Sequence, residues 1–151
     1  MRIALAADHA GVVLKDRVKR ALDERHLNYD DFGTTSKTSV DYPDYALRVA
    51  RGIASGTYDR AILICGSGVG MAMAANKVPG VRAASVTNAD AARLSREHND
   101  ANVVTLGARS LRTNTALEII DAFLATPFAG GRHQRRVDKI TAIERGAEKI
   151  Q

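Results

Sequence analysis

The only cysteine of the chain lies where an apolar segment runs into a glycine-rich turn. Cys65 follows the apolar residues 62–64 and precedes the sequence GSGVG at positions 66–70. A thiolate is stabilised at a helix N-terminus, where it can act as a nucleophile or a base. The N–H groups of such a turn attract a phosphate or a developing oxyanion. A small core cysteine beside an ordinary tight turn is the alternative interpretation.

The glycine pattern does not match the common nucleotide-binding motifs. Position 71 is Met, so the dinucleotide fingerprint G-x-G-x-x-G is incomplete, and no Gly-Lys-Ser/Thr follows as in a P-loop. An oxyanion site or a phosphate site therefore remains, without a nucleotide implied.

Two other segments carry polar groups suited to a charged ligand. His98, Asn99 and Asp100 form a polar trio, and the sequence GGRHQRR at 130–136 is strongly basic. Arg132 and Arg136 are four positions apart, so they project from one side of a helix and can clamp one phosphate. A packed core histidine at 98 and a solvated or nucleic-acid-binding basic face at 130–136 are the alternatives.

Short apolar runs predict the strands that must position these groups. Continuous rather than alternating apolar character is typical of a strand covered on both faces. The runs are Ile3–Ala7, Ala61–Cys65, Ala83–Val86 and Asn102–Leu106, with a weaker candidate at Asn28–Phe32.

Amphipathic segments between these runs predict helices. A capping box from Thr115 to Glu118 marks the start of the fifth helix and Pro127 its end. The third helix is short and covers 69–77, and a terminal helix follows the glycines at 130–131. The predicted apolar faces are Leu14, Val18, Ala21 and Leu22; Ala46, Val49, Ala50 and Ile53; Ala91, Leu94 and His98; Ala116, Ile120, Phe123 and Leu124; and Val137, Ile140, Ile143 and Ala147.

The alternation of strands and helices predicts an α/β fold. We expect a three-layer, Rossmann-like (flavodoxin-like) sandwich with a five-stranded parallel sheet and a C-terminal helix, as a single domain over residues 1–151. In such a sheet a ligand binds beyond the carboxyl ends of the first and third strands, which brings Asp8 and His9 beside 65–70. The helix at 88–98 runs away from that edge, so His98 and Arg132 reach the opposite end of their own subunit. If all these groups share one site, at least a dimer is required.

Composition limits the class of protein. Hydrophobic residues make up 45% and charged residues 26% of the 151, an ordinary globular balance. No apolar run approaches the roughly 20 residues that span a bilayer, and the N-terminal apolar segment is too short for a signal peptide. One cysteine excludes an internal disulfide, which agrees with a reducing compartment, and we expect a cytoplasmic protein. The single cysteine also excludes thiolate zinc sites and no His/Cys/carboxylate cluster has metal spacing, so we expect no metal, and we expect no cofactor. The formal charge of +5 is compatible with an anionic small molecule, an anionic surface or nucleic acid as a partner, and equally with a basic solvated surface.

Five motifs together resemble one enzyme family over nearly the whole chain. They are DHAG at 8–11, DYPDYA at 41–46, ILICGSGVGMAMAANKVPGVRAA at 62–84, LSREHNDANVVTLGAR at 94–109 and GGRHQRRV at 130–137. The sequence is similar to the type B ribose-5-phosphate isomerases, whose family includes galactose-6-phosphate and allose-6-phosphate isomerases. The resemblance implies aldose–ketose isomerisation through an enediolate, without metal, at sites shared by two subunits.

The resemblance also implies roles for particular residues. Cys65 matches the base that moves a proton between C1 and C2, and His98 matches the acid/base that opens the furanose ring. Some relatives use a glutamate at the position of Met71, but methionine cannot accept a proton, which leaves Cys65 as the base. The turn N–H groups, with Ser67 among the catalytic residues, match those that stabilise the enediolate oxygen. The implied substrate-binding residues are Asp8, His9, Tyr42, Gly66, Ser67, Gly68, Val69, Gly70, Asn99, Arg109, Arg132 and Arg136.

The predicted reaction is the interconversion of ribose 5-phosphate and ribulose 5-phosphate by a homodimer or a tetramer. The alternatives are isomerisation of allose 6-phosphate, galactose 6-phosphate or a tetrose phosphate, and non-catalytic binding of a sugar phosphate. Nucleic-acid binding through the basic run is disfavoured, because aromatic residues make up only 5% and no nucleic-acid-reading motif is present.

Overall fold

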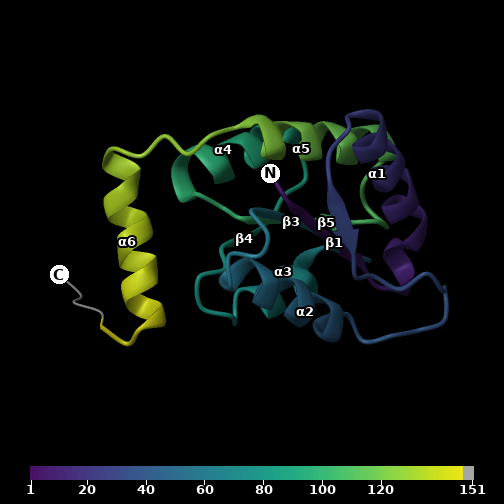
Figure 1. Cartoon of the computed structure of the whole chain (residues 1–151), viewed down its shortest axis with the longest axis horizontal. Helices are drawn as coiled ribbons and strands as arrows, with labels where there is room; N and C mark the ends of the chain where they lie inside the picture. Colours follow the sequence, from purple (N-terminus) through teal and green to yellow (C-terminus); the bar gives the residue numbers. More distant parts are fainter. Residues whose placement is uncertain (148–151) are drawn as a thin grey trace.

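A five-stranded parallel sheet forms the centre of the molecule (Figure 1). The structure is a computed structural model and describes residues 1–147. The strand order is β2-β1-β3-β5-β4, and every pair of neighbours is parallel. The strands are β1 (Ile3–Ala7), β2 (Tyr29–Asp31), β3 (Arg60–Cys65), β4 (Ala83–Ser85) and β5 (Val103–Gly107).

Helices cover both faces of the sheet. A short 3₁₀ helix, η1 (His9–Gly11), follows β1, and the α-helices are α1 (Val12–Glu24), α2 (Tyr42–Ala54), α3 (Val69–Ala75), α4 (Ala89–Asn99), α5 (Thr113–Ala125) and α6 (Arg132–Glu144). One layer contains α1, α4 and α5, and the other contains α2 and α3. The three-layer α/β sandwich predicted from the sequence is therefore confirmed. One detail differs from the flavodoxin-like order, because β5 lies between β3 and β4.

The core explains why the strands are apolar throughout. Successive side chains of a strand point to opposite faces, so a sheet covered on both sides needs apolar residues at every position. In β1, Ile3 and Leu5 enter the core under α1 and α5, while Ala4 and Ala6 enter the core under α2. All five residues of β1 are fully buried.

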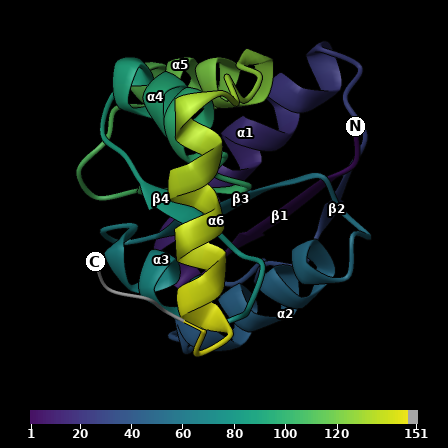
Figure 2. The same cartoon turned by 90° about the vertical axis from the view of Figure 1, so that its left-hand side faces the viewer.

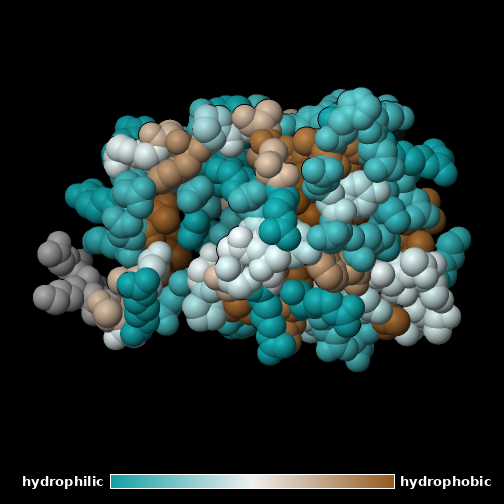
Figure 3. All heavy atoms as spheres, viewed as in Figure 1, coloured by the Kyte–Doolittle hydropathy of each residue, from teal (hydrophilic) through white to brown (hydrophobic). Residues whose placement is uncertain are grey.

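Helix α6 stands apart from the two helical layers. It runs along the β4 edge of the sheet, from the layer of α4 and α5 toward the layer of α2 and α3 (Figures 1 and 2). Only Val137 of this helix is buried, whereas Ile140 and Ile143 are 40% and 61% exposed. Figure 3 shows hydrophobic residues on the side of α6 that faces the sheet. The apolar face predicted for the terminal helix is thus only partly covered, and Ala147 lies beyond the end of the helix.

The five strands predicted from the sequence are confirmed, each boundary within one residue. The face predicted for the helix at 88–98 is wrong. The buried residues of α4 are Ala92, Ser95 and Arg96, while Leu94 is 37% exposed. The buried guanidinium of Arg96 meets an acidic partner, and a polarity pattern cannot reveal such a pair.

The predicted helix starts and ends are partly confirmed. The capping box at Thr115 is wrong, because α5 begins at Thr113 and the residue before it, Arg112, makes no side-chain capping hydrogen bond. The predicted stop before Pro127 is confirmed, and the short third helix ends at Ala75 rather than at 77. Among residues 1–147, no helix has both the length and the apolar character needed to cross a membrane.

Candidate active site

An open pocket of about 680 Å³ lies at the carboxyl ends of β1 and β3. The two strands are neighbours, with Ala7 opposite Ile64, so the residues that follow them come together. The pocket is lined by Asp8, His9, Ala10, Tyr42, Cys65, Gly66, Ser67, Val69, Gly70, Met73, Arg109 and Ser110. The sequence predicted nine of these twelve, and Gly68 lies in the same turn. Ala10, Met73 and Ser110 were missed, since nothing in their types suggests a site.

Cys65 is held against the glycine turn by a backbone hydrogen bond. The N–H of Gly68 donates to Cys65 Sγ at 3.2 Å, and the cysteine is only 4% exposed. Gly68 adopts a φ of +80°, a left-handed conformation that favours glycine. Ser67 Oγ accepts the N–H of Val69 at 3.3 Å. The sulfur therefore lies at the pocket wall, oriented toward the turn.

Asp8 and His9 are both anchored by local hydrogen bonds. Asp8 Oδ1 accepts the N–H groups of Ala10 and Gly11 at 3.0 and 3.2 Å, so this carboxylate caps η1. His9 Nδ1 accepts the N–H of Val40 at 3.2 Å. In the neutral ring the proton is then on Nε2, which is free to donate to a ligand.

Two of the glycines make room for polar side chains of the pocket. A Cβ on Gly66 would lie 3.0 Å from Arg109 Nη1, and a Cβ on Gly70 would lie 2.5 Å from Cζ of Tyr42. Arg109 and Tyr42 therefore pack directly on the backbone of the turn. The pocket wall that contains Cys65 therefore also carries a cationic group and a phenol.

A second polar cluster lies where α4 ends and α6 begins. The rings of His98 and His133 are stacked, with centroids 4.2 Å apart and planes inclined by 11°. Loss of solvation and the neighbouring charges of His98, Arg132 and Arg136 lower the pKa of His133 below its usual 6.5, against the opposite effect of Glu97. The sequence did not single out His133 as a site residue, because no spacing rule shows that the two helix ends meet.

The two clusters lie at opposite ends of the parallel strands. Cys65 is opposite Gly107, the last residue of β5, whereas His98 and Asn99 end the helix that leads into the first residue of β5. Arg132 and Arg136 lie in the first turns of α6, near the end of α4, because His133 of α6 stacks on His98. One chain therefore does not bring the two clusters together.

Asn99 faces a third region. It lines an open groove of about 480 Å³ between α6 and the β4 edge, together with Arg82, Ile140, Ile143 and Glu144 among others. Most of the groove surface is contributed by apolar residues, and it contains neither a cysteine nor a histidine. Within the described part of the chain, no group of three or more His, Cys, Asp or Glu residues is arranged to hold a metal ion.

The chain matches the family model described as Ribose/Galactose Isomerase over residues 3–140. It is 47% identical over 143 residues to the ribose-5-phosphate isomerase B of Escherichia coli, which covers 95% of this chain and 96% of the relative. The ribose-5-phosphate isomerase B of Clostridium thermocellum superimposes with a TM-score of 0.95 at 49% identity, covering 98% of this chain and 100% of the other.

A solved relative contains a sugar phosphate. The ribose-5-phosphate isomerase B of Mycoplasma genitalium with bound ribulose-5-phosphate superimposes with a TM-score of 0.90 at 43% identity, covering 95% of this chain and 96% of that one. The match to the family model extends over nine-tenths of the chain and includes both polar clusters. The chain therefore belongs to the Ribose/Galactose Isomerase family, as its motifs predict, and its enzyme class is that of the aldose–ketose isomerases.

Proposed function

We propose that the protein interconverts ribose 5-phosphate and ribulose 5-phosphate through an enediolate, with Cys65 as the base. The observation that carries the proposal is the position of the Cys65 sulfur, fixed 3.2 Å from the N–H of Gly68 in the wall of a pocket that also holds His9 and Arg109. The bound ribulose-5-phosphate of the Mycoplasma genitalium relative supports a pentose phosphate as the substrate.

The proposed chemistry uses one acid/base group and a set of fixed donors. The Cys65 thiolate removes the proton from C2 of the open-chain aldose, and the electron pair forms a C1–C2 double bond as negative charge moves to the oxygen on C1. The thiol then returns the proton to C1, while a proton passes from the oxygen on C2 to the oxygen on C1. A hydrogen bond from a backbone N–H stabilises negative charge on the sulfur. Met71, at the position where some relatives use a glutamate, cannot serve as the base because it is buried and its thioether cannot accept a proton.

The donors for the developing oxyanion come from the turn. Gly68 and Val69 already donate their N–H groups, to Cys65 Sγ and Ser67 Oγ respectively. Among the residues that the structure describes, the N–H groups of Gly66, Ser67, Gly70 and Met71 have no acceptor. Gly66, Ser67 and Gly70 line the pocket, so we assign the oxyanion to their N–H groups, since fixed donors aimed at developing charge need no reorganisation during the reaction.

A second copy of the chain completes the proposed site. The cluster at the end of α4 and the start of α6 supplies His98 to open the furanose ring and Arg132 and Arg136 to bind phosphate, but it cannot reach the Cys65 of its own chain. Asn99 lines the groove beside α6, and its proposed contact with a sugar hydroxyl rests on the family resemblance. Apolar side chains flank both clusters: Val69 and Met73 of α3 are 47% and 64% exposed, and Ile140 and Ile143 of α6 are exposed as well. Such surfaces are typical of a contact between subunits.

Removal of the sulfur tests the base. Cys65→Ala is expected to lower kcat on ribose 5-phosphate by about 10²–10⁴-fold, the usual contribution of a general base, while the sugar phosphate still binds. Calorimetric titration with ribulose 5-phosphate measures the binding, and Ala72→Ser, at a position of α3 that does not line the pocket, is the control for a small change near the turn. Turnover near that of the unaltered protein would exclude Cys65 as the base.

Complementation between two inactive variants tests the shared site. Cys65→Ala and His98→Ala each disable every site of a homodimer. A mixed dimer has one site with both defects and one site with none, so random exchange of subunits restores about a quarter of the full activity in a two-fold symmetric assembly. Absence of recovery in a mixture shown by mass spectrometry to contain mixed dimers would refute the shared site.

A longer phosphorylated aldose is the second candidate substrate. The matching family is described as Ribose/Galactose Isomerase. The pocket is open to solvent, so its walls do not limit the substrate to the length of a pentose. Values of kcat/KM on ribose 5-phosphate, allose 6-phosphate, galactose 6-phosphate and a tetrose phosphate decide between the substrates. A cytoplasmic location remains a prediction of the sequence.

A further inference from the structure

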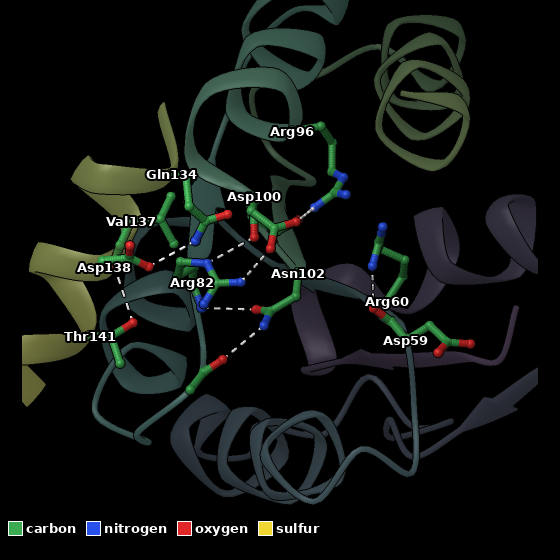
Figure 4. A network of polar contacts seen from close by, with 12 residues as sticks. Asp59, Arg60, Arg82, Arg96, Asp100, Asn102, Gln134, Val137, Asp138 and Thr141 are labelled. Carbon is green, nitrogen blue, oxygen red and sulfur yellow. Dashed lines mark hydrogen bonds and ion pairs between the residues drawn. The ribbon is translucent and has the colours of Figure 1, made fainter. Parts of the chain in front are cut away.

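Helix α4 ends just before Asp100, whose carboxylate lies between Arg82 and Arg96 (Figure 4). Asp100 has φ +47° and ψ +43°, the left-handed region where glycine usually ends a helix. Its N–H donates to the carbonyl of Arg96 at 3.1 Å, and the N–H of Ala101 donates to the carbonyl of Ser95 at 3.0 Å. This is the hydrogen-bond pattern of a glycine cap, formed here by an aspartate.

Two arginines explain why the residue is an aspartate. Arg96 Nη1 binds Asp100 Oδ1 and Arg82 Nη2 binds Asp100 Oδ2, both at 2.8 Å. Arg82 Nε also donates to the backbone carbonyl of Asp100 at 2.9 Å. Arg96 is only 2% exposed, so its charge depends on this partner. The side chain of Asp100 therefore fixes the direction in which α4 ends.

The same arginine joins the end of α4 to the segment that leads into α6. Arg96 Nε donates to the carbonyl of Thr126 at 3.2 Å, just after α5. Close by, the N–H of Ala129 donates to the carbonyl of Glu97 at 3.1 Å. The end of α4 and the start of α6 are thus tied together through residues 126–129.

These two helix ends carry the stacked imidazoles. His98 lies in the last turn of α4 and His133 in the first turn of α6, so the stack at 4.2 Å exists only while both ends keep their positions. We propose that Asp100 and Arg96 are positioning residues for His98, holding its imidazole against His133 in the orientation that ring opening requires. This inference rests on the proposed function of His98, whereas the stacking itself can be measured without a substrate.

Replacement of Asp100 separates positioning from folding. Asp100→Gly removes the carboxylate but adopts the left-handed conformation without strain, so the helix cap survives. Asp100→Asn keeps one acceptor oxygen at the same place and tolerates the same backbone. Asp121→Asn is the matched control, since Asp121 also pairs with an arginine, Arg25, at 2.7 Å but joins α1 to α5.

Three measurements distinguish the possible results. The imidazole NMR signals of His98 and His133 report the stack directly. Turnover of ribose 5-phosphate requires opening of the furanose, whereas wash-in of solvent deuterium at C1 of saturating ribulose 5-phosphate, an open-chain sugar, requires only the proton transfer at Cys65. The melting temperature reports the fold.

In Asp100→Gly we expect both imidazole signals to shift and turnover of ribose 5-phosphate to fall about tenfold or more. Wash-in is expected to stay within about twofold, while Asp100→Asn recovers part of the turnover and Asp121→Asn changes nothing. The melting temperature of Asp100→Gly is expected to fall, because the buried Arg96 loses its acidic partner, so all variants are assayed well below that temperature. Unshifted imidazole signals, or equal losses of turnover and wash-in, would overturn the inference. If the parent protein shows no isomerase activity, the proposed function fails, and the imidazole signals still decide whether Asp100 positions His98.

Discussion

Gly68 links the stability of the fold to the position of the candidate base. Its φ of +80° is unfavourable for any residue with a Cβ. An added Cβ would also lie 3.0 Å from the backbone carbon of Leu106 and 3.1 Å from the nitrogen of Gly107. Both contacts are backbone atoms of β5, a buried strand that cannot move aside. The same residue donates the N–H that holds Cys65 Sγ.

The cost of Gly68→Ala is the sum of two effects. The left-handed conformation costs an alanine about 1–2 kcal/mol. Pressing a methyl group against a packed interior costs about 1–3 kcal/mol more. The free energy of unfolding is therefore expected to fall by about 2–5 kcal/mol, which lowers the melting temperature of a chain of this length by about 4–20 °C. The strain also displaces the turn from the sulfur, so kcat is expected to drop about tenfold or more.

Gly56→Ala is the matched control for this substitution. Gly56 has a similar φ of +72°, but a Cβ there meets nothing within 4 Å. Only the conformational penalty of about 1–2 kcal/mol remains, and kcat should not change. Thermal unfolding at one protein concentration and kcat on ribose 5-phosphate are compared for both variants. Equal destabilisation of the two would show that the backbone of β5 gives way, and the reasoning about the Gly68 contact would be wrong.

Two further predictions concern Asp31, at the end of β2, and Gly66, in the turn of the pocket. Burial alone would raise the pKa of Asp31, but hydrogen bonds from Lys15, the N–H of Gly33 and Lys19 outweigh it and hold the pKa below the usual 3.8. This carboxylate therefore stabilises the fold above about pH 4, and that stabilisation is lost as the pH falls through its folded pKa. In urea titrations, the difference in stability between the parent and Asp31→Asn is expected to shrink from pH 6 to pH 3, and a constant difference would contradict this. Gly66→Ala is expected to raise KM for ribose 5-phosphate by about tenfold, because its Cβ meets the guanidinium of Arg109, a charge-assisted contact worth about 1.5–3 kcal/mol, while the melting temperature changes little.

Most of the fold could be predicted because the sheet is covered on both faces. Every position of β1 must be apolar, and the continuous apolar run Ile3–Ala7 therefore predicts a strand buried on both faces. The gathering of Asp8, His9 and Cys65 follows from the topology alone, since β1 and β3 are neighbours and both end at the same edge. Arg109 was assigned as a substrate-binding residue only through the family resemblance, and no local pattern predicts that its side chain packs on Gly66.

The features that the sequence did not reveal depend on pairs of residues far apart in the chain. Arg96 reads as a surface residue of an amphipathic helix, yet it is buried because Asp100 and the carbonyl of Thr126 satisfy its guanidinium. The stack of His98 on His133 depends on how α6 leaves α5. A periodicity argument considers one helix at a time and cannot anticipate either arrangement.

Two ion pairs with a buried cation, Lys15–Asp31 and Arg96–Asp100, are features that hydrophobic patterns do not predict, and their positions suggest a role. Lys15, 1% exposed, binds Asp31 at the end of β2, and Asp31 in turn accepts the N–H of Gly33 at the start of the loop that later anchors His9. Near the amino ends of the strands, Arg96 and Asp100 fix the end of α4. A buried charge contributes little net stability compared with an apolar side chain of the same volume, but it tolerates few alternative arrangements. Each polar cluster is thus connected to one such pair, which is expected if the two clusters form one site across two subunits, as proposed above.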